Sequence, residues 1–213
     1  MLNLDASMIG SNTDNQTTWT DTSGEGNNGT LNNGADYSSI NGGVLNLDGV
    51  DDYVSVAPIR TYSVGMWVKP SSSQVDTYPT YYNQNNQNTE QGYWWVYSVG
   101  SSTTMNWQYT NGSTLNTISW NDVISYDEWN YFIFIYNDSS KTVTLYKNGD
   151  SVSTKSCPGA IVPADSLYIG DYQGQSNGYN LKGLINGFRV YDEPLSSDEI
   201  NKIFDTHRRR YGL

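Results

Sequence analysis

The 213-residue sequence has one cysteine, Cys157, and one histidine, His207. A single cysteine cannot form a disulfide within the chain, so packing or a metal ion must stabilise the fold. One cysteine and one histidine are too few for the four ligands of a usual zinc site. A histidine followed by three arginines is also poorly placed for a catalytic triad. We therefore expect Cys157 to be a small buried side chain and His207 to be a solvated residue at a helix end.

Basic residues and long apolar runs are also scarce. Lysine and arginine number 11 against 22 aspartate and glutamate residues, which gives a formal net charge of −11 at pH 7. This charge excludes a general affinity for nucleic acid or for an anionic membrane, and it favours the binding of cations. No segment approaches the apolar length of a membrane span. The N-terminus, "MLNLDASMIG", lacks the basic and apolar regions of a signal peptide.

Short runs of β-branched and aromatic residues are abundant. About ten of them, such as "DYVSVA" and "TVTLYKNGD", are separated by Gly, Asn, Asp and Pro turn signals. This pattern predicts an all-β protein, an antiparallel sandwich or barrel, and no linker divides residues 1–213 into two domains. The run "WNYFIFIY" is apolar at every position, which suits a central strand covered on both faces.

Two segments lack apolar periodicity. The first, Trp19 to Gly34, reads "WTDTSGEGNNGTLNNG" and mixes Gly with Asn and Asp, which predicts consecutive tight turns above a buried Trp19. The second, Ser71 to Gly92, is too long for an ordinary connection. We predict there a loop that carries function or is mobile.

Residues 196–213 predict the one convincing helix and a basic tail. Ser196 or Ser197 can cap the helix, and an apolar stripe follows at Ile200, Ile203 and Phe204. The tail, "RRRYGL", comprises Arg208, Arg209, Arg210 and Tyr211 before the last two residues. These residues either dock on an acidic patch of a partner or complement the helix dipole, and the sequence leaves both readings open.

Several pieces of the chain together resemble the laminin-G-like, concanavalin A-like jelly-roll domains, in the versions found in bacteriophage and bacterial surface proteins. The pieces are "LDA" near the start, "WTDTSGEGNNGTLNNG", "NGGVLNLDGVDDYVSV", "YSVGMWVKP", "EWNYFIFIYNDSSKTVTLYKNGD", "LYIGDYQ" and "GLINGFRVYDEPLSSDEI", which run in the family's order from Leu4 to Ile200. The resemblance implies an antiparallel jelly-roll β-sandwich with glycan or protein ligands and, in some members, a calcium ion. The family also includes glucanases.

The acidic residues do not show the catalytic pattern of those glucanases. Retaining glycosidases need two carboxyls about 5 Å apart, and residues at i and i+2 of a strand lie on one face at about that spacing. No Asp or Glu in this chain has a second acid two residues on. We therefore expect no catalysis and assign no catalytic residue.

The turn "LDGVDD" offers a possible calcium site. Calcium takes several oxygen ligands, which Asp48 and Asp51 can provide. The resemblance implies a third ligand on the last long strand, where Asn186 stands, and Asp171 is a further candidate in a loop. The alternative is that these carboxylates only accept hydrogen bonds from turn amides. A calcium site predicts that a chelator lowers the thermal midpoint.

Aromatic and amide side chains predict a surface for ligands. Sugars bind on flat aromatic faces beside planar hydrogen-bonding groups. The predicted ligand residues are Tyr78, Tyr81, Tyr82, Asn83, Asn85, Trp94, Trp95, Trp107 and Tyr109. Adjacent tryptophans in a strand must point to opposite faces, so one of Trp94 and Trp95 lies in the core. Such a surface suits a protein partner equally well.

The leading hypothesis is a non-enzymatic surface protein of a bacteriophage virion, a capsid decoration or fibre-associated lectin-like domain, made in the host cytoplasm. Its partners would be other virion proteins, cell-surface glycan and further copies of itself, without nucleic acid or membrane. The alternative is a free carbohydrate-binding module or an extracellular bacterial adhesin. A glucanase-like hydrolase ranks third.

Overall fold

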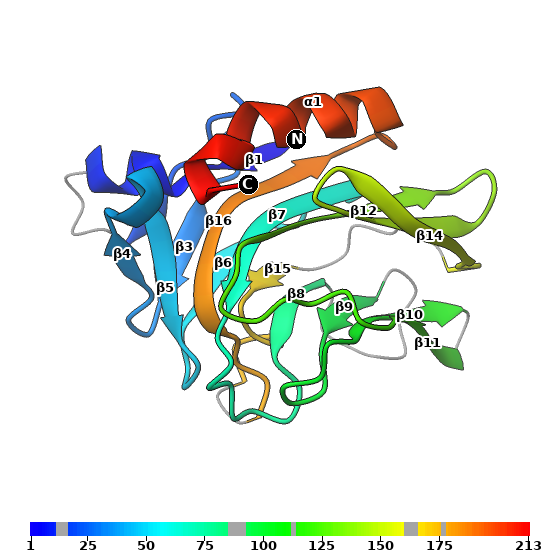
Figure 1. The fold of residues 1–213 in the computed structure, drawn as a ribbon, viewed down its shortest axis with the longest axis horizontal. Coiled ribbons are helices and arrows are strands. Elements are labelled where there is room, and N and C mark those ends of the chain that lie inside the picture. The colour runs from blue at the N-terminus through cyan, green and yellow to red at the C-terminus, as the bar shows by residue number, and fades with distance from the viewer. Residues whose placement is uncertain (12–16, 85–92, 112–113, 160–165, 176–177) are drawn as a thin grey trace.

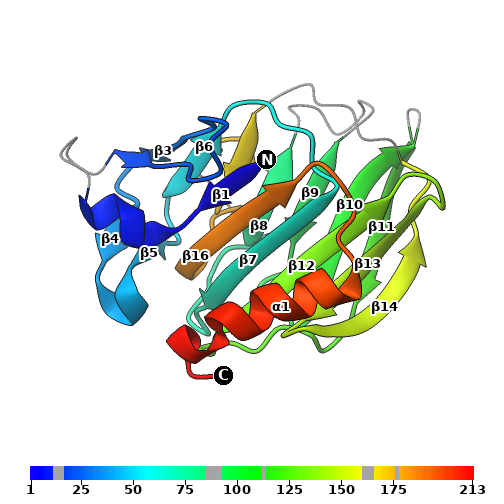
Figure 2. The same cartoon turned by 90° about the horizontal axis from the view of Figure 1, so that it is seen from above.

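The structure is a computed structural model, which describes residues 1–11, 17–84, 93–111, 114–159, 166–175 and 178–213. Two antiparallel sheets pack face to face as a sandwich, and one helix covers the outer face of one of them (Figures 1 and 2). The predicted all-β antiparallel sandwich is confirmed. None of the described helices is both long and apolar enough to cross a membrane.

Each sheet has eight strands among the described residues. The first sheet contains, in order across it, β14 (Asp150–Ser156), β13 (Thr142–Lys147), β12 (Asn130–Asn137), β7 (Ser63–Pro70), β16 (Lys182–Tyr191), β5 (Val44–Asp48) and β4 (Asp36–Ser38), with β1 (Leu2–Leu4) also paired to β16. The second sheet contains β11 (Thr114–Trp120), β10 (Met105–Asn111), β9 (Trp94–Tyr97), β8 (Thr80–Gln84), β15 (Leu167–Ile169), β6 (Tyr53–Val56), β3 (Gly29–Asn32) and β2 (Thr18–Trp19). The helices are η1 (Ala6–Ser11), η2 (Ile40–Gly42), α1 (Ser197–His207) and η3 (Arg208–Tyr211).

Strand β12 is the predicted central strand, buried on both faces. Phe132 and Phe134 enter the core between the sheets, whereas Ile133 and Ile135 lie in a second cluster beneath α1. This explains why its sequence lacks alternation, since neither face meets water. Cys157 is also fully buried in the main core, as expected.

The prediction of consecutive turns throughout segment 19–34 holds only in part, because Gly29–Asn32 forms strand β3, which pairs with β2 and β6, whereas residues 22–28 and 33–34 lie outside the strands. Trp19 is fully buried beneath it. The carboxylate of Asp21 accepts hydrogen bonds from the backbone N–H groups of Asn3, Ser23 and Asn27, each at 2.9 Å. These bonds hold the turns without regular structure, so the polar residues here have a structural role.

The prediction of a loop throughout residues 71–92 is wrong, because Thr80–Gln84 forms strand β8. All five of its residues are buried, and it pairs with both β9 and β15. Tyr81 and Tyr82 both belong to the core, and the pairing register shifts between Thr80 and Tyr82. A bulge of this kind removes the two-residue alternation by which a strand is recognised in a sequence.

The C-terminal helix closes the outer face of the first sheet. Ser196 caps it with a reciprocal capping box to Glu199, as expected from the sequence. The apolar stripe that includes Ile200 and Phe204 packs on this face. Beyond the helix, the ring of Tyr211 stacks on Trp67 of β7 with centroids 4.1 Å apart.

Most side chains of the basic tail contact other residues of the same chain. The prediction that Arg210 and Tyr211 form a docking surface for a partner is therefore wrong. Nη1 of Arg210 donates to both carboxylate oxygens of Asp5, at 3.0 and 3.1 Å, and Nη2 donates to the carbonyl of Gly43. Tyr211 is buried against Trp67. Arg210 and Tyr211 therefore anchor the helix to the N-terminal segment and to the first sheet.

The first two arginines of the tail differ from Arg210. Arg208 pairs with Asp205 of its own helix, at 3.0 Å. Arg209 is exposed, and docking through it stays a prediction.

His207 is not the solvated residue expected from the sequence. Its Nδ1 lies 2.7 Å from the carbonyl of Ile203, and its Nε2 lies 3.0 Å from Arg189. Burial and the neighbouring Arg189 lower the pKa of His207, against a raising contribution from the Ile203 carbonyl. The neutral imidazole therefore donates to Ile203 and accepts from Arg189.

Removing the Tyr211 ring should loosen the C-terminal helix from the sheet. Tyr211→Ala loses a buried ring stacked on Trp67, so we expect a loss of about 3 kcal/mol in the free energy of unfolding in urea. Arg209→Ala, at an exposed position in the same segment, should change stability by less than about 0.5 kcal/mol. Equal stabilities for the two variants would contradict the packing role of the tail.

The buried histidine predicts a pH dependence of stability. The pKa of His207 is lower in the folded state than in the unfolded chain, so its stabilising contribution is present above pH 6.5 and is lost as pH falls through the folded pKa. His207→Gln should show a smaller loss of thermal midpoint than the wild type between pH 7.5 and pH 5. Parallel curves for the two proteins would show that His207 does not titrate with unfolding.

Candidate functional site

The strands of the second sheet contain no charged residue. All eight of them are built from apolar, aromatic, hydroxyl and amide residues. Their inner face belongs to the core. The part of their outer face that the described strand residues form therefore carries no charged side chain, on a chain of net charge −11.

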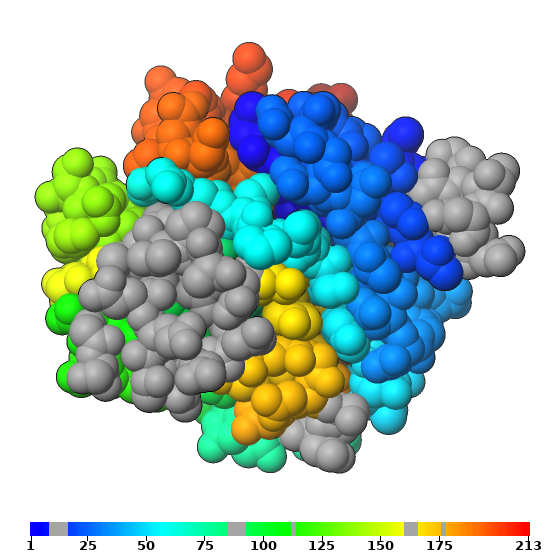
Figure 3. Space-filling model, turned by 180° about the vertical axis from the view of Figure 1, so that it is seen from behind, coloured from blue at the N-terminus to red at the C-terminus, as the bar shows by residue number. Residues whose placement is uncertain are grey.

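An aromatic cluster lies on this outer face, and we call it the outer aromatic surface. It comprises Tyr78, Tyr93, Trp95, Tyr97, Tyr172 and Tyr179. Trp95 lies at its centre, stacked on Tyr97 at 3.9 Å between centroids and 4.8 Å from Tyr172. Tyr93, Trp95 and Tyr97 are buried by their neighbours, at 1%, 8% and 7% exposed, and Tyr172 and Tyr179 are half-buried. Tyr78 stacks with Tyr179 at 5.9 Å and is the one exposed member, at 37%. Figure 3 shows the gold segment of β15 and the loop after it, which carries Tyr172, at the surface beside the cyan and blue N-terminal segments.

Hydrogen bonds hold the rings of this surface in place. The indole N–H of Trp95 donates to the hydroxyl of Thr80 at 2.9 Å. Tyr93 donates through its hydroxyl to the Gln108 side chain at 3.2 Å, and the amide of Gln108 donates to Thr117. Orienting partners of this kind reduce the conformational entropy that a ligand-binding ring loses on binding.

Five of the predicted ligand residues are core residues instead. Their side chains are at most 5% exposed and face the first sheet: Tyr81, Tyr82, Trp94, Trp107 and Tyr109. Trp107 and Tyr109 do share a face, as expected, but it is the inner one, because Tyr109 pairs with Trp94 across the ladder. The expectation that they form a binding platform is therefore wrong.

The other four predicted ligand residues lie in different parts of the structure. Tyr78 and Trp95 lie on the outer aromatic surface. Asn83 is fully buried and donates to the carbonyl of Trp94, so it is a structural residue. Asn85 lies outside the described residues.

Four aromatic members of the surface were missed from the sequence. Tyr97 could have been found, because it lies two residues after Trp95 and shares its face. Tyr93 is the residue directly before the strand. Tyr172 and Tyr179 come from the loop between β15 and β16, which has no sequence signal that points it toward β9.

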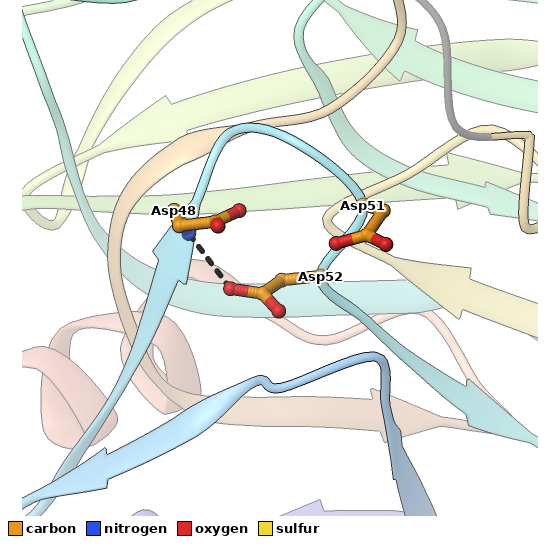
Figure 4. Close-up of side chains that lie close together, drawn as sticks. All are labelled: Asp48, Asp51 and Asp52. Carbon is orange, nitrogen blue, oxygen red and sulfur yellow. Dashed lines mark hydrogen bonds between the residues drawn. The ribbon is translucent and has the colours of Figure 1, made fainter.

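The carboxylates of the β5–β6 turn gather as predicted. Ligand atoms of Asp48, Asp51 and Asp52 lie within 4.8 Å of one another (Figure 4). Asp52 accepts a hydrogen bond from the backbone N–H of Asp48 at 2.9 Å, and Asp48 accepts one from Val50 at 2.7 Å. Burial, followed by the charge of Asp48, raises the pKa of Asp52 to about 6, against a lowering by the Asp48 amide. These bonds match the turn-amide alternative, and a calcium ion here stays a prediction.

Asn186 is not part of this group, so that part of the predicted calcium site is wrong. Its Oδ1 accepts from the backbone N–H groups of Ala6 and Gly187, each at 2.7 Å. Its amide donates to the Gly43 carbonyl and to the Tyr211 hydroxyl. A fully buried and fully hydrogen-bonded amide fixes the irregular register of β16 and has no oxygen left for a metal.

A second acidic group lies beside the outer aromatic surface. Asp171 and Asn180 are each 1% exposed, and among the described residues both carboxylate oxygens of Asp171 and the Oδ1 of Asn180 lack a hydrogen-bond partner. Burial raises the pKa of Asp171 to about 6, and the nearby charge of Asp76 adds to this. The N–H groups of Tyr172, Gln175 and Gly174 point toward the carboxylate and lower its pKa, but none completes a hydrogen bond to it.

A groove of about 440 Å³ lies on the first sheet, and the sequence did not indicate it. Its polar lining includes Asp48, Lys69, Asp127 and Lys182. Hydrogen bonds from Ser72, followed by the charge of Lys69, lower the pKa of Asp127. A general acid for glycoside hydrolysis needs a raised pKa, so Asp127 does not suit that role.

Comparison with protein families and solved structures gives a consistent result. A family model described as the concanavalin A-like lectin/glucanases superfamily matches residues 48–201 of the chain. A search of curated proteins found no significant match.

Among solved structures, receptor-binding domains of botulinum neurotoxins share the fold. The serotype D domain matches with a TM-score of 0.73 and 17% identity, over 97% of this chain and 52% of its own. A serotype D ligand-binding domain solved with N-acetylneuraminic acid has a TM-score of 0.72 and 18% identity, over 97% and 50% of the two chains. A type DC binding domain solved with rat synaptotagmin II has a TM-score of 0.71 and 17% identity, over 97% and 51%. The chain thus spans about half the length of these neighbours.

Proposed function

Because the chain belongs to the concanavalin A-like lectin/glucanases superfamily, we propose that it is a lectin-like domain that binds neutral glycans on the outer face of its second sheet. The observation that carries this proposal is the outer aromatic surface on a sheet whose strands have no charged residue. The structural neighbours include domains solved with a sugar and with a protein receptor, which supports a binding role.

The chemistry of the surface fits a sugar ring. The C–H faces of a pyranose pack on aromatic rings, and its hydroxyls pair with hydroxyl and amide groups. Tyr78 offers an exposed ring above Trp95, and Gln108 and Thr117 lie on the neighbouring strands. Without a Lys or Arg on these strands, the surface has no partner for the carboxylate of an acidic sugar. We therefore expect neutral sugars to bind in preference to sialylated ones.

The domain is proposed to be non-catalytic. The strands of the second sheet provide no carboxylate, so glycan bound there would meet no acid or nucleophile from the strands. Incubation with a panel of β-glucans should release no reducing ends.

An exposed ring of the surface provides the test. The wild type should bind a subset of neutral glycans on an array, with an affinity for the best one that changes little between 50 mM and 500 mM NaCl. Tyr78→Ala should weaken that binding about tenfold in calorimetry, through the loss of ring stacking.

The matched control is Val152→Ala on β14 of the first sheet, which has a similar exposure of 40%. It should bind like the wild type. Equal binding by both variants, or selective binding of sialylated glycans, would place the ligand elsewhere on the molecule.

A protein partner is the second candidate for the same surface. Tyr and Trp are enriched in protein interfaces, and one structural neighbour was solved with a protein receptor. If a partner protein covers the surface, Tyr78→Ala should weaken that complex while the glycan array stays blank.

The proposed setting is the surface of a bacteriophage virion, as a capsid decoration or fibre-associated domain. The resemblance of the sequence to the phage versions of the family supports this setting, and a free carbohydrate-binding module or adhesin is the alternative. Mass spectrometry of purified particles from the source phage should detect the chain. Its consistent absence from particles would reject the setting and leave glycan binding to be tested separately.

A further inference from the structure

The loop between β15 and β16 places one acidic and one amide side chain opposite each other. The backbone N–H of Leu181 donates to the carbonyl of Gly170 at 2.8 Å. In an antiparallel arrangement this bond brings Asp171 opposite Asn180, and cross-strand neighbours have Cβ atoms about 5 Å apart on one face. The next pair, Tyr172 and Tyr179, points to the other face, with ring centroids 5.1 Å apart. The loop thus has oxygens on one side and two rings of the outer aromatic surface on the other.

A third oxygen-bearing side chain comes from the loop between β7 and β8. Asp76 accepts a hydrogen bond from the backbone N–H of Asn180 at 2.7 Å through Oδ2. The side-chain amide of Asn180 donates to the carbonyl of Val50 at 2.7 Å, which fixes its orientation and leaves its Oδ1 free on the opposite side. The loops after β5, β7 and β15 therefore meet at the lower end of the sandwich in Figure 1.

These oxygens lack the partners that buried groups normally have. A buried carboxylate without a hydrogen bond or counter-charge is strongly unfavourable. Within the part of the chain that the structure describes, both oxygens of Asp171 and the Oδ1 of Asn180 have no hydrogen-bond partner, and no salt bridge involves Asp76 or Asp171. A cation bound between these side chains would interact favourably with all of these oxygens.

We propose that Asp171, Asn180 and Asp76 bind a divalent cation of the calcium class, which holds the β15–β16 loop so that Tyr172 and Tyr179 pack against Trp95. Carboxylate and amide oxygens are the ligands that calcium prefers, and water or backbone carbonyls complete its coordination. This site uses other side chains than the β5–β6 turn, where Asp48, Asp51 and Asp52 gather within 4.8 Å of one another, although Asn180 adjoins that turn through its bond to Val50. Only the effect on glycan binding rests on the proposed function.

The experiment compares two isosteric variants of the full chain after dialysis against EDTA. CaCl₂ should raise the thermal midpoint of the wild type and of Asp48→Asn, and should leave Asp171→Asn unchanged. Calorimetric titration with CaCl₂ should show at least about a tenfold weaker affinity for Asp171→Asn. In EDTA, Asp171→Asn should melt no lower than the wild type, because the substitution removes an unpaired buried charge.

Three results would overturn the cation site. Calcium could leave the wild-type midpoint unchanged, which would mean that the N–H groups of Tyr172, Gly174 and Gln175 suffice for the carboxylate. Asp48→Asn could abolish the calcium effect while Asp171→Asn retains it, which would assign the ion to the β5–β6 turn. Asp171→Asn could melt lower than the wild type in EDTA, which would give Asp171 a purely structural role.

The failure of this site and that of the proposed function are distinguishable. Tyr78→Ala should lose glycan binding but keep the calcium-induced rise in midpoint. Asp171→Asn should keep its fold and lose only the calcium dependence of glycan affinity. A calcium-induced rise without any glycan binding would reject the function and retain the site.

Discussion

The two-residue alternation of strands is the constraint on which the rest of this structure depends. Because of this alternation, Trp94, Trp107 and Tyr109 of the second sheet lie in the core, whereas Trp95 and Tyr97 lie on the outer face. A shift of β9 by one residue against β10 would turn Trp94 to the outside and Trp95 and Tyr97 into the core. The buried pairing of Tyr109 with Trp94 therefore positions the rings that we propose as a binding surface.

The outer faces of the two sheets are covered by different groups. The first sheet carries an apolar outer face and covers it with its own C-terminal helix, which Tyr211 and Arg210 hold in place. The second sheet leaves its outer face to aromatic rings with hydrogen-bonded polar edges. Rings of that kind tolerate water and still offer apolar area to a ligand. The distribution of charge follows the same division. Among the described strands, those of the first sheet contain charged residues and those of the second sheet contain none.

The sequence predicts the fold better than the site, for a physical reason. Turn signals, the alternation in β6 and β13, the apolar β12 and the cap at Ser196 are local features, and each was interpreted correctly. Which of two faces becomes the inner one depends on pairing with distant strands, so Trp107 and Tyr109 of β10 were assigned to the wrong side, and the sequence left open which of Trp94 and Trp95 lies in the core. The bulge in β8 and the packing of Tyr172 and Tyr179 on Trp95 likewise depend on contacts between distant segments. Asn186 shows the same limit, because its four hydrogen bonds join residues 6, 43, 187 and 211.

Mapping the seven tryptophan indole N–H signals by ¹⁵N NMR during titration with the best-binding neutral glycan tests the central claim most directly. The account predicts that the Trp95 signal shifts at the outer aromatic surface, while those of Trp67 and Trp129 beneath the C-terminal helix stay in place. Shifts confined to Trp67 and Trp129, with Trp95 unmoved, would contradict it and would place the ligand on the first sheet.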